Sequence, residues 1–432
     1  MFETIVGQGA VNQLARDKVA GKLAPSLLFA GPPASGKGSA ALELARVLSC
    51  EQANAPEDCV CTSCARHRAL ADPDTLLLGS RPFYAEIAAS AAAFQRDTAA
   101  GRTLFIRAIR KLLARFSPDL WEEDAKFNKI SAYLVALEED IDALNLAKTE
   151  AALKKRVDSI LKNALKLESE GMSDLIPIAQ IRRAAYWSHL APSGRRKFLL
   201  LENADRMQEG ARNSLLKLLE EPPASLTVVL TSAREGTLLP TILSRLRPYR
   251  FVQRPPELEA QVIQSLFREE SAKGIGAYLD SFLPVSAESL QPLAAFLAAS
   301  IALKTVRLLR RAGRPLPEEL VALGKISAPI AENAGLGRPG TDAKTVIAKV
   351  VDGAGGFELR SLFLRFLSSL LALVSESAAG ELTHTPNIGR DIWRKYTGEA
   401  ANAVGTYNQS PALALERLMS ALPSELARSF GV

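Results

Sequence analysis

Short apolar runs that end in glycine or polar residues alternate with helical segments along much of the chain. Three such runs, at residues 27–30, 198–201 and 227–230, are followed by Gly31, Glu202 and Thr231. Uninterrupted apolar runs of this length are typical of strands buried on both faces of a parallel sheet. Ala- and Leu-rich segments with helical spacing, at 39–48 and 207–219, follow the first two runs. This alternation predicts an α/β domain with a parallel sheet and right-handed crossovers.

The pattern changes twice, and each change indicates a boundary. Residues 83–173 lack strand signals, keep a helical period and carry equal numbers of basic and acidic residues, which predicts a solvated helical insertion. After Arg254-Pro255-Pro256 the chain is helical to its end. We place one boundary at Pro255 and another near Pro284, so that residues 1–253, 254–283 and 284–432 form three parts.

Composition is typical of a globular chain. The 432 residues are 47% hydrophobic and 23% charged, which suffices for two or three domains. A net charge of +6 permits contact with phosphates without identifying a nucleic-acid partner. The first residues carry no signal-like segment, and the apolar runs at 293–303 and 366–374 are short for a membrane span. We therefore expect a cytoplasmic protein with no membrane partner.

The first candidate site is a glycine-rich loop between a predicted strand and a predicted helix. It reads Gly31-Pro32-Pro33-Ala34-Ser35-Gly36-Lys37 and matches seven positions of a phosphate-binding loop. In such loops glycines let backbone N–H groups converge on phosphate oxygens, and the lysine adds a cation. Gly38 stands where a Ser or Thr hydroxyl usually binds Mg²⁺, and Ser39 follows it. We predict nucleotide binding with ATP as the candidate ligand and a doubtful Mg²⁺ site.

The residues after the second predicted strand bear on hydrolysis. Phosphoryl transfer to water requires a carboxylate near the metal and a group that orients the attacking water. Glu202 is one methylene longer than the usual aspartate, and Asn203 cannot accept a proton as a general base does. Together with Gly38, these departures affect the same reaction. The pattern favours nucleotide binding without efficient turnover over an ordinary polar turn.

All four cysteines lie in one short segment, at Cys50, Cys59, Cys61 and Cys64. Four thiolates can satisfy tetrahedral Zn²⁺, and such a closed site stabilises a short loop that has little core. We predict a structural zinc ion held by the four cysteines, with reduced or redox-active thiols as the alternative. Because the cysteines already fill a closed site, we expect the nearby His67 to be a surface or core residue.

Several motifs occur together in an order and spacing that resemble one family. They are Val6-Gly7-Gln8, the loop at 31–37, the cysteines at 50–64, the run at 213–223 that ends Leu-Leu-Glu-Glu-Pro-Pro, and the run at 239–245 that ends in Ser244-Arg245. In combination they resemble the AAA+ subunits of bacterial replication clamp loaders, which belong to the DNA polymerase III holoenzyme. The resemblance covers residues 1–82 and 175–253 well and is weak beyond Pro255. It leaves the helical insertion without a role.

The resemblance implies roles for particular residues. Val6, Gly7 and Gln8 would lie near the adenine pocket, and Thr231 or Ser232 would occupy the sensor position beside the γ-phosphate. Arg245 would be an arginine finger that reaches the nucleotide of a neighbouring subunit. Residues 1–253 would be an AAA+ nucleotide-binding domain, 254–283 a helical lid and 284–432 the collar that holds a pentameric ring together.

Within this family the altered Glu202-Asn203 pair favours the delta-prime type, usually a poor ATPase or none. The ATP-hydrolysing gamma/tau type is the main alternative. The implied partners are gamma/tau and delta subunits, the sliding clamp and primed DNA. A nucleotide kinase, suggested by the turn at 36–39, and a zinc scaffold that has lost nucleotide binding are more distant alternatives. Basic residues at 182, 183, 195, 196 and 197 could contact a nucleic-acid backbone, although solvated surface explains them equally well.

Overall fold

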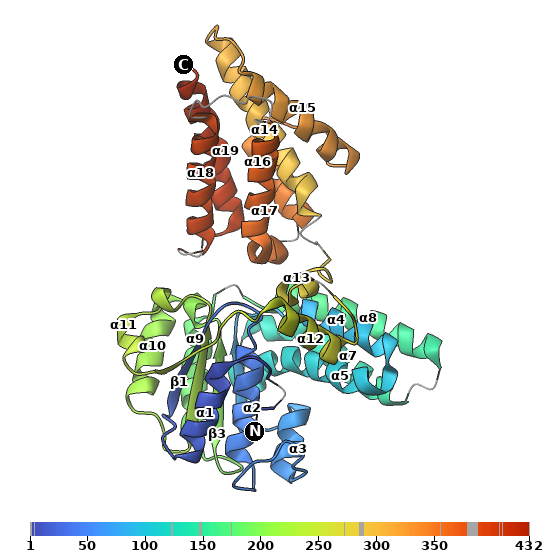
Figure 1. Ribbon diagram of the computed structural model, residues 1–432, viewed down its shortest axis with the longest axis vertical. Helices are drawn as coiled ribbons and strands as arrows, with labels where there is room; N and C mark the ends of the chain where they lie inside the picture. Colours follow the sequence, from blue (N-terminus) through green and yellow to red (C-terminus); the bar gives the residue numbers. More distant parts are fainter. Residues whose placement is uncertain are drawn as a thin grey trace. The chain divides into compact units, whose positions relative to one another are not determined.

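A computed structural model describes the chain except at residues 1, 4, 122–123, 147–148, 174, 272, 285–288, 355, 378–387, 406, 408 and 432. The chain divides into two compact units, Met1–Phe282 and Leu283–Val432. The first contains a parallel sheet with helices, and the described part of the second is helical (Figure 1). This confirms the predicted fold class, an α/β domain followed by an all-α domain.

The first unit is built on a five-stranded parallel sheet with the strand order β2-β3-β4-β1-β5. Its strands are β1 (Ser26–Ala30), β2 (Thr75–Gly79), β3 (Lys197–Glu202), β4 (Leu226–Ser232) and β5 (Arg247–Arg250). The three predicted runs are β1, β3 and β4. The strands β2 and β5 were not predicted. The edge strand β5 reads Arg-Pro-Tyr-Arg and buries only Tyr249, so it has no apolar run to detect.

Alternate strand residues enter two separate hydrophobic cores, one on each face of the sheet. Leu28 and Leu199 face one core, whereas Leu27 and Phe198 face the other. The second core is covered by α1 (Gly9–Val19), α2 (Lys37–Ser49) and the cysteine segment with α3 (Thr62–Ala69). The first is covered by α9 (Ile178–His189), α10 (Glu209–Glu220), α11 (Pro240–Leu243) and the insertion. Burial on both faces explains why the central strands are continuously apolar.

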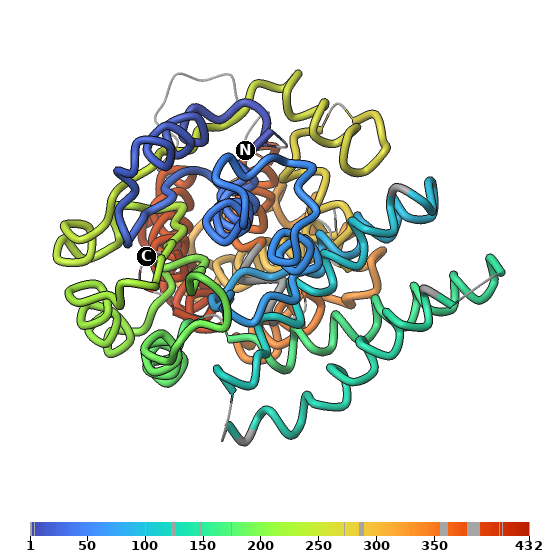
Figure 2. The backbone as a smooth tube through the Cα atoms, turned by 90° about the horizontal axis from the view of Figure 1, so that it is seen from below, coloured from blue at the N-terminus to red at the C-terminus, as the bar shows by residue number. Residues whose placement is uncertain are grey.

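The insertion is helical, as predicted, but it is not merely solvated. Its helices are α4 (Tyr84–Arg96), α5 (Thr98–Leu113), α6 (Pro118–Trp121), α7 (Ala125–Leu146) and α8 (Glu150–Gly171). In Figure 2 α7 and α8 run side by side as two long helices. Phe105 and Ile160 are fully buried in the core that also contains Leu28 and Leu76 of the sheet. The expected solvated hairpin is therefore wrong in this respect, because the insertion extends the core of the domain.

Two helices after β5, α12 (Pro256–Phe267) and α13 (Ile275–Asp280), complete the first unit. They pack on α4 through Ile263, Phe267 and Tyr278, which bury Ala89 and Ala93 of the insertion. Arg96 Nη1 also donates to the Phe267 carbonyl over 3.1 Å. The segment expected to be a lid is thus joined to the insertion by a core of its own.

The second unit contains α14 (Leu290–Arg311), α15 (Glu318–Asn333), α16 (Ala343–Ala354), α17 (Gly356–Ser377), α18 (Ile388–Gly405) and α19 (Pro411–Ser429). The central helix is α14, which contacts α15, α16, α17 and α19. Among the described residues, α14 is the one helix long and apolar enough to cross a membrane by length and composition. Since 67% of its apolar window is buried within the protein, it has the character of a core helix.

Candidate functional site

The glycine-rich loop connects β1 to α2, and α2 begins at Lys37. Gly36, at the N-cap, has a left-handed φ of 93°, which a residue with a side chain adopts only with strain. Lys37 Nζ donates to the carbonyls of Gly31 (2.7 Å) and Pro32 (2.5 Å). Burial, reinforced by the charge of Arg81, lowers the pKa of Lys37 to about 8. Ser35 is buried and Ser39 is exposed.

The N-terminal segment Val6-Gly7-Gln8 is fixed against the end of the sheet. Gln8 uses both atoms of its amide on Val252: Nε2 donates to the carbonyl over 2.8 Å, and Oε1 accepts from the amide N–H over 3.0 Å. Arg254 then bridges this segment to the glycine-rich loop, donating to the carbonyls of Val6 (2.8 Å) and Ala34 (3.1 Å). Arg254 was not predicted as a site residue, because its one signal in the sequence is its place beside the Pro255 boundary.

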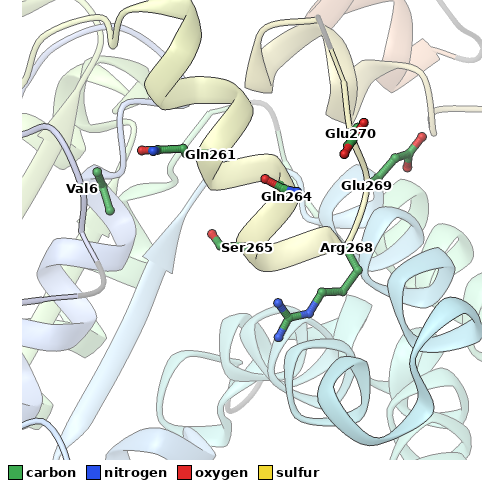
Figure 3. A pocket seen from close by; sticks show the side chains of 7 residues that line it. All are labelled: Val6, Gln261, Gln264, Ser265, Arg268, Glu269 and Glu270. Atoms are coloured by element: carbon green, nitrogen blue, oxygen red, sulfur yellow. The ribbon is translucent and has the colours of Figure 1, made fainter.

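A cavity of about 700 Å³ lies between the N-terminal segment and α12. Its volume is in the range of small-molecule pockets. Figure 3 shows Val6 on one side and Gln261, Gln264 and Ser265 along α12 on the other. The lining residues are Val6, Gln261, Gln264, Ser265, Arg268, Glu269 and Glu270. Of the residues predicted to bind nucleotide, the cavity therefore includes Val6.

Glu202, at the end of β3, is buried and paired with two arginines. Its Oε2 accepts a hydrogen bond from Arg115 Nη2, and its Oε1 lies 3.3 Å from Arg81 Nη1. Arg115 belongs to the insertion, in the short turn Ala114–Phe116 that follows α5. Burial, reinforced by Arg81 and opposed by Glu202, lowers the pKa of Arg115 to about 10. The negative charge of Glu202 is thus compensated by two arginines of the same chain.

Gly38 and Glu202 form a complementary pair. A Cβ atom placed on Gly38 would approach Glu202 Oε1 to 2.6 Å, closer than real Cβ contacts permit. The longer glutamate therefore occupies the space that a Ser or Thr side chain would need at position 38. Two departures that look independent in the sequence are therefore sterically linked.

The remaining polar residues at this edge of the sheet form hydrogen bonds and an ion pair with one another. Thr231 Oγ1 accepts from the Asn203 amide N–H over 3.2 Å, and Ser232 Oγ donates to Asp205 Oδ1 over 3.0 Å. Asp205 Oδ2 lies 2.9 Å from Arg234 Nη2. Glu202, the last residue of β3, and Asp205, in the turn after it, are therefore both paired with arginine.

This donor set does not fit Mg²⁺. The metal prefers several oxygen ligands in near-octahedral geometry. Position 38 offers no hydroxyl, and both Glu202 and Asp205 are already engaged by guanidinium groups. The Mg²⁺ site that the sequence made doubtful therefore lacks its usual oxygen ligands at these three positions.

Arg245 lies on the surface just after α11, away from the residues of the glycine-rich loop in the sequence but beside α10 in space. Its Nη2 is 2.7 Å from Glu220 Oε1, and its Nη1 donates to the Thr241 carbonyl over 2.7 Å. The pair is exposed, and such pairs contribute little to stability. The side chain is therefore held in place yet accessible.

The four cysteines come together, with sulfur atoms all within 4.8 Å of one another. Zn–S bonds of about 2.3 Å in a tetrahedron imply sulfur separations of about 3.8 Å, and Cys50 Sγ lies 3.7 Å from Cys59 Sγ. Arg46 Nη1 donates to Cys64 Sγ over 3.2 Å. His67 is buried outside this cluster, 3.7 Å from Asp72. The cluster could bind a metal ion, and zinc fits its donor set.

The structure corrects one candidate for nucleic-acid contact. Lys197 is buried in β3, where its ammonium donates to the Trp187 carbonyl over 2.5 Å and lies 4.3 Å from the Trp187 ring centroid. It is unavailable to a phosphate backbone. Arg182 and Arg195 are exposed.

The glycine-rich loop at the end of a parallel sheet and the appended helical unit define a phosphate-loop protein of the AAA+ type. The family model described as "DNA polymerase III, delta subunit" matches residues 7–255, more than half of the chain. The chain therefore belongs to this family, and the resemblance to clamp-loader subunits of the DNA polymerase III delta/gamma type is confirmed.

Two individual proteins can be compared with the chain. It is 41% identical to DNA polymerase III subunit delta' of Pseudomonas aeruginosa over 80 residues, which are 18% of this chain and about a quarter (24%) of that protein. The crystal structure of a DNA polymerase III gamma subunit-related protein from Thermotoga maritima aligns over 96% of this chain and 99% of its own, with 14% identity and a TM-score of 0.35.

Proposed function

We propose that this protein is the delta-prime-type subunit of a DNA polymerase III clamp loader. In this role it binds nucleotide without efficient hydrolysis and supplies Arg245 to the nucleotide of a neighbouring subunit, helping to load the sliding clamp onto primed DNA. Its partners are gamma/tau and delta subunits, with residues 254–283 as the lid and 284–432 as the collar. A structural zinc ion is held by Cys50, Cys59, Cys61 and Cys64.

The pairing of Glu202 with Arg115 is the observation that carries this proposal. A carboxylate held by a buried guanidinium is poorly suited to the metal-assisted step that hydrolysis requires. The same pairing argues against the gamma/tau alternative, in which Glu202 and Ser39 would substitute for the usual ligands. Exposure of Arg245 supports the second half of the proposal, since an arginine finger must reach beyond its own subunit.

Reconstituting the loader with Arg245→Ala tests the role in trans. We expect clamp loading and clamp-stimulated ATP hydrolysis by the complex to fall at least ~10-fold, because the guanidinium stabilises developing phosphate charge. Arg245→Lys should fail similarly, since lysine lacks the planar fork. Arg250→Ala, which removes another exposed arginine, is the matched control. Unchanged loading by the Arg245→Ala complex would contradict the proposal.

Nucleotide affinity should also depend on the protonation of Lys37. Because the pKa of Lys37 is about 8, the ammonium is largely charged below this pH and loses its proton above it. We expect ATP affinity to fall by up to about tenfold per pH unit as pH rises above 8. Titrations of labelled ATP between pH 7 and 9.5 should show this decline in the wild type, whereas Lys37→Met should bind weakly at every pH. An equal decline in both proteins would assign the titration to another group.

A further inference from the structure

The network around Glu202 holds more cations than carboxylates. Its cations are Lys37, Arg81, Lys111 and Arg115, and its carboxylates are Glu86 and Glu202. The neighbouring Asp205 also acts on Lys37, and it is paired with Arg234, so counting both residues leaves the excess of positive charge unchanged. A site with an excess of fixed positive charge beside a phosphate loop suits a polyanion.

Apart from Lys37, which belongs to the loop itself, Arg81 is the cation of this network that lies beside the loop. Its Nη1 lies 3.6 Å from a Cβ atom placed on Gly38, close to where a Ser or Thr at this position would carry its hydroxyl. The side chain of Arg81 is 33% exposed, so a ligand on the loop can contact it. Glu86 and Glu202 each accept a hydrogen bond from Arg81, at 2.6 Å and 3.3 Å, and its guanidinium lies 4.8 Å from the Phe83 ring centroid.

Arg115 acts behind Glu202. Its side chain is 3% exposed, which prevents direct contact with a ligand. It contacts Glu202 from the insertion, and its guanidinium lies 5.2 Å from the ring centroid of Phe83, the ring that Arg81 also contacts. Trp121 Nε1 donates to the Arg115 carbonyl over 2.7 Å and fixes the turn. Arg115 is therefore a positioning residue, which orients Glu202 and through it Arg81.

We propose that this chain binds the polyphosphate of a nucleotide without a divalent cation, with Arg81 supplying at the phosphate loop the positive charge that a metal brings elsewhere. Arg115 and Glu202 position Arg81, which gives the helical insertion a role in ligand binding. The inference rests on the nucleotide binding proposed above and adds the ionic form of the ligand that is bound.

Binding of a fluorescent ATP analogue to the 432-residue chain tests this, measured once with excess EDTA and once with excess MgCl₂. We expect the dissociation constant in EDTA to equal or be lower than that in MgCl₂. Arg81→Gln should weaken binding in EDTA by about tenfold or more, the effect of losing one charge-assisted hydrogen bond. Arg81→Lys, which retains the charge, should recover part of the affinity, and Arg250→Gln should bind as the wild type does.

The outcomes separate the two proposals. Binding that is at least tenfold tighter with Mg²⁺ would overturn metal-free recognition while leaving nucleotide binding intact. Wild-type affinity in folded Arg81→Gln would overturn the role of Arg81. The absence of binding in both buffers would overturn nucleotide binding itself, and this inference with it. Circular dichroism establishes that each variant is folded.

Discussion

Replacing Cys64 with serine is expected to abolish binding of the proposed zinc ion and to loosen the segment from residue 50 to residue 69. Cys64 is fully buried and is one of four sulfur donors, so its loss leaves an open, three-coordinate site. Structural zinc contributes directly to folding, with apparent binding free energies of about 10–16 kcal/mol in small peptides. Cys50, Cys59 and Cys64 also belong to the core beneath α2. The loss of stability should therefore extend to α2, the helix that follows the phosphate loop.

Elemental analysis should find about one zinc ion per wild-type chain and a value near zero for Cys64→Ser. Hydrogen exchange should become much faster between residues 50 and 69, while β3 and β4 keep their protection. Val60→Ala is the matched control, because Val60 lies between two cysteines but is 88% exposed. A wild-type protein purified without chelators and free of zinc would contradict the expectation.

Glu202→Ala should destabilise the first unit by about 3–5 kcal/mol, the usual cost of leaving one partner of a buried ion pair behind. Among the described residues, Arg115 Nε and Nη1 already lack hydrogen-bond partners, so Glu202 is the partner that compensates its buried charge. Adding Arg115→Met to Glu202→Ala should restore much of the loss, since methionine fills the space without a charge.

Hydrogen exchange of β3 under native conditions measures this free energy within the first unit, independently of the helical unit. Glu235→Ala, which breaks the exposed 3.6 Å pair with Arg250, should cost less than about 1 kcal/mol. If the changes in unfolding free energy caused by Glu202→Ala and Arg115→Met simply add, the two residues do not stabilise one another and their pairing contributes nothing to stability.

Sequence patterns predicted the parts of the fold that depend on local chemistry. The central strands β1, β3 and β4 were found because both of their faces are buried. The cysteine cluster was found because its four ligands lie within 15 residues of one another. The edge strand β5 was missed because only Tyr249 is buried there.

The partners of Glu202 could not be predicted in the same way. Arg115 and Arg81 lie 87 and 121 residues before it in the chain, and only the packing of the insertion against the sheet brings them together. The sequence did show that Gly38 and Glu202 depart from the usual pattern. It could not show that one side chain occupies the space left by the other.

The packing of α12 and α13 against α4 has a mechanical consequence. Moving these helices away from α4 would expose Phe267 and Tyr278 to water and break the hydrogen bond from Arg96, so such a movement would be opposed by the exposure of apolar surface. A nucleotide that bound in the cavity beside Val6 would then contact an α12 that does not move. In the ring proposed above, this subunit would therefore keep α12 and α13 fixed on α4 when nucleotide binds.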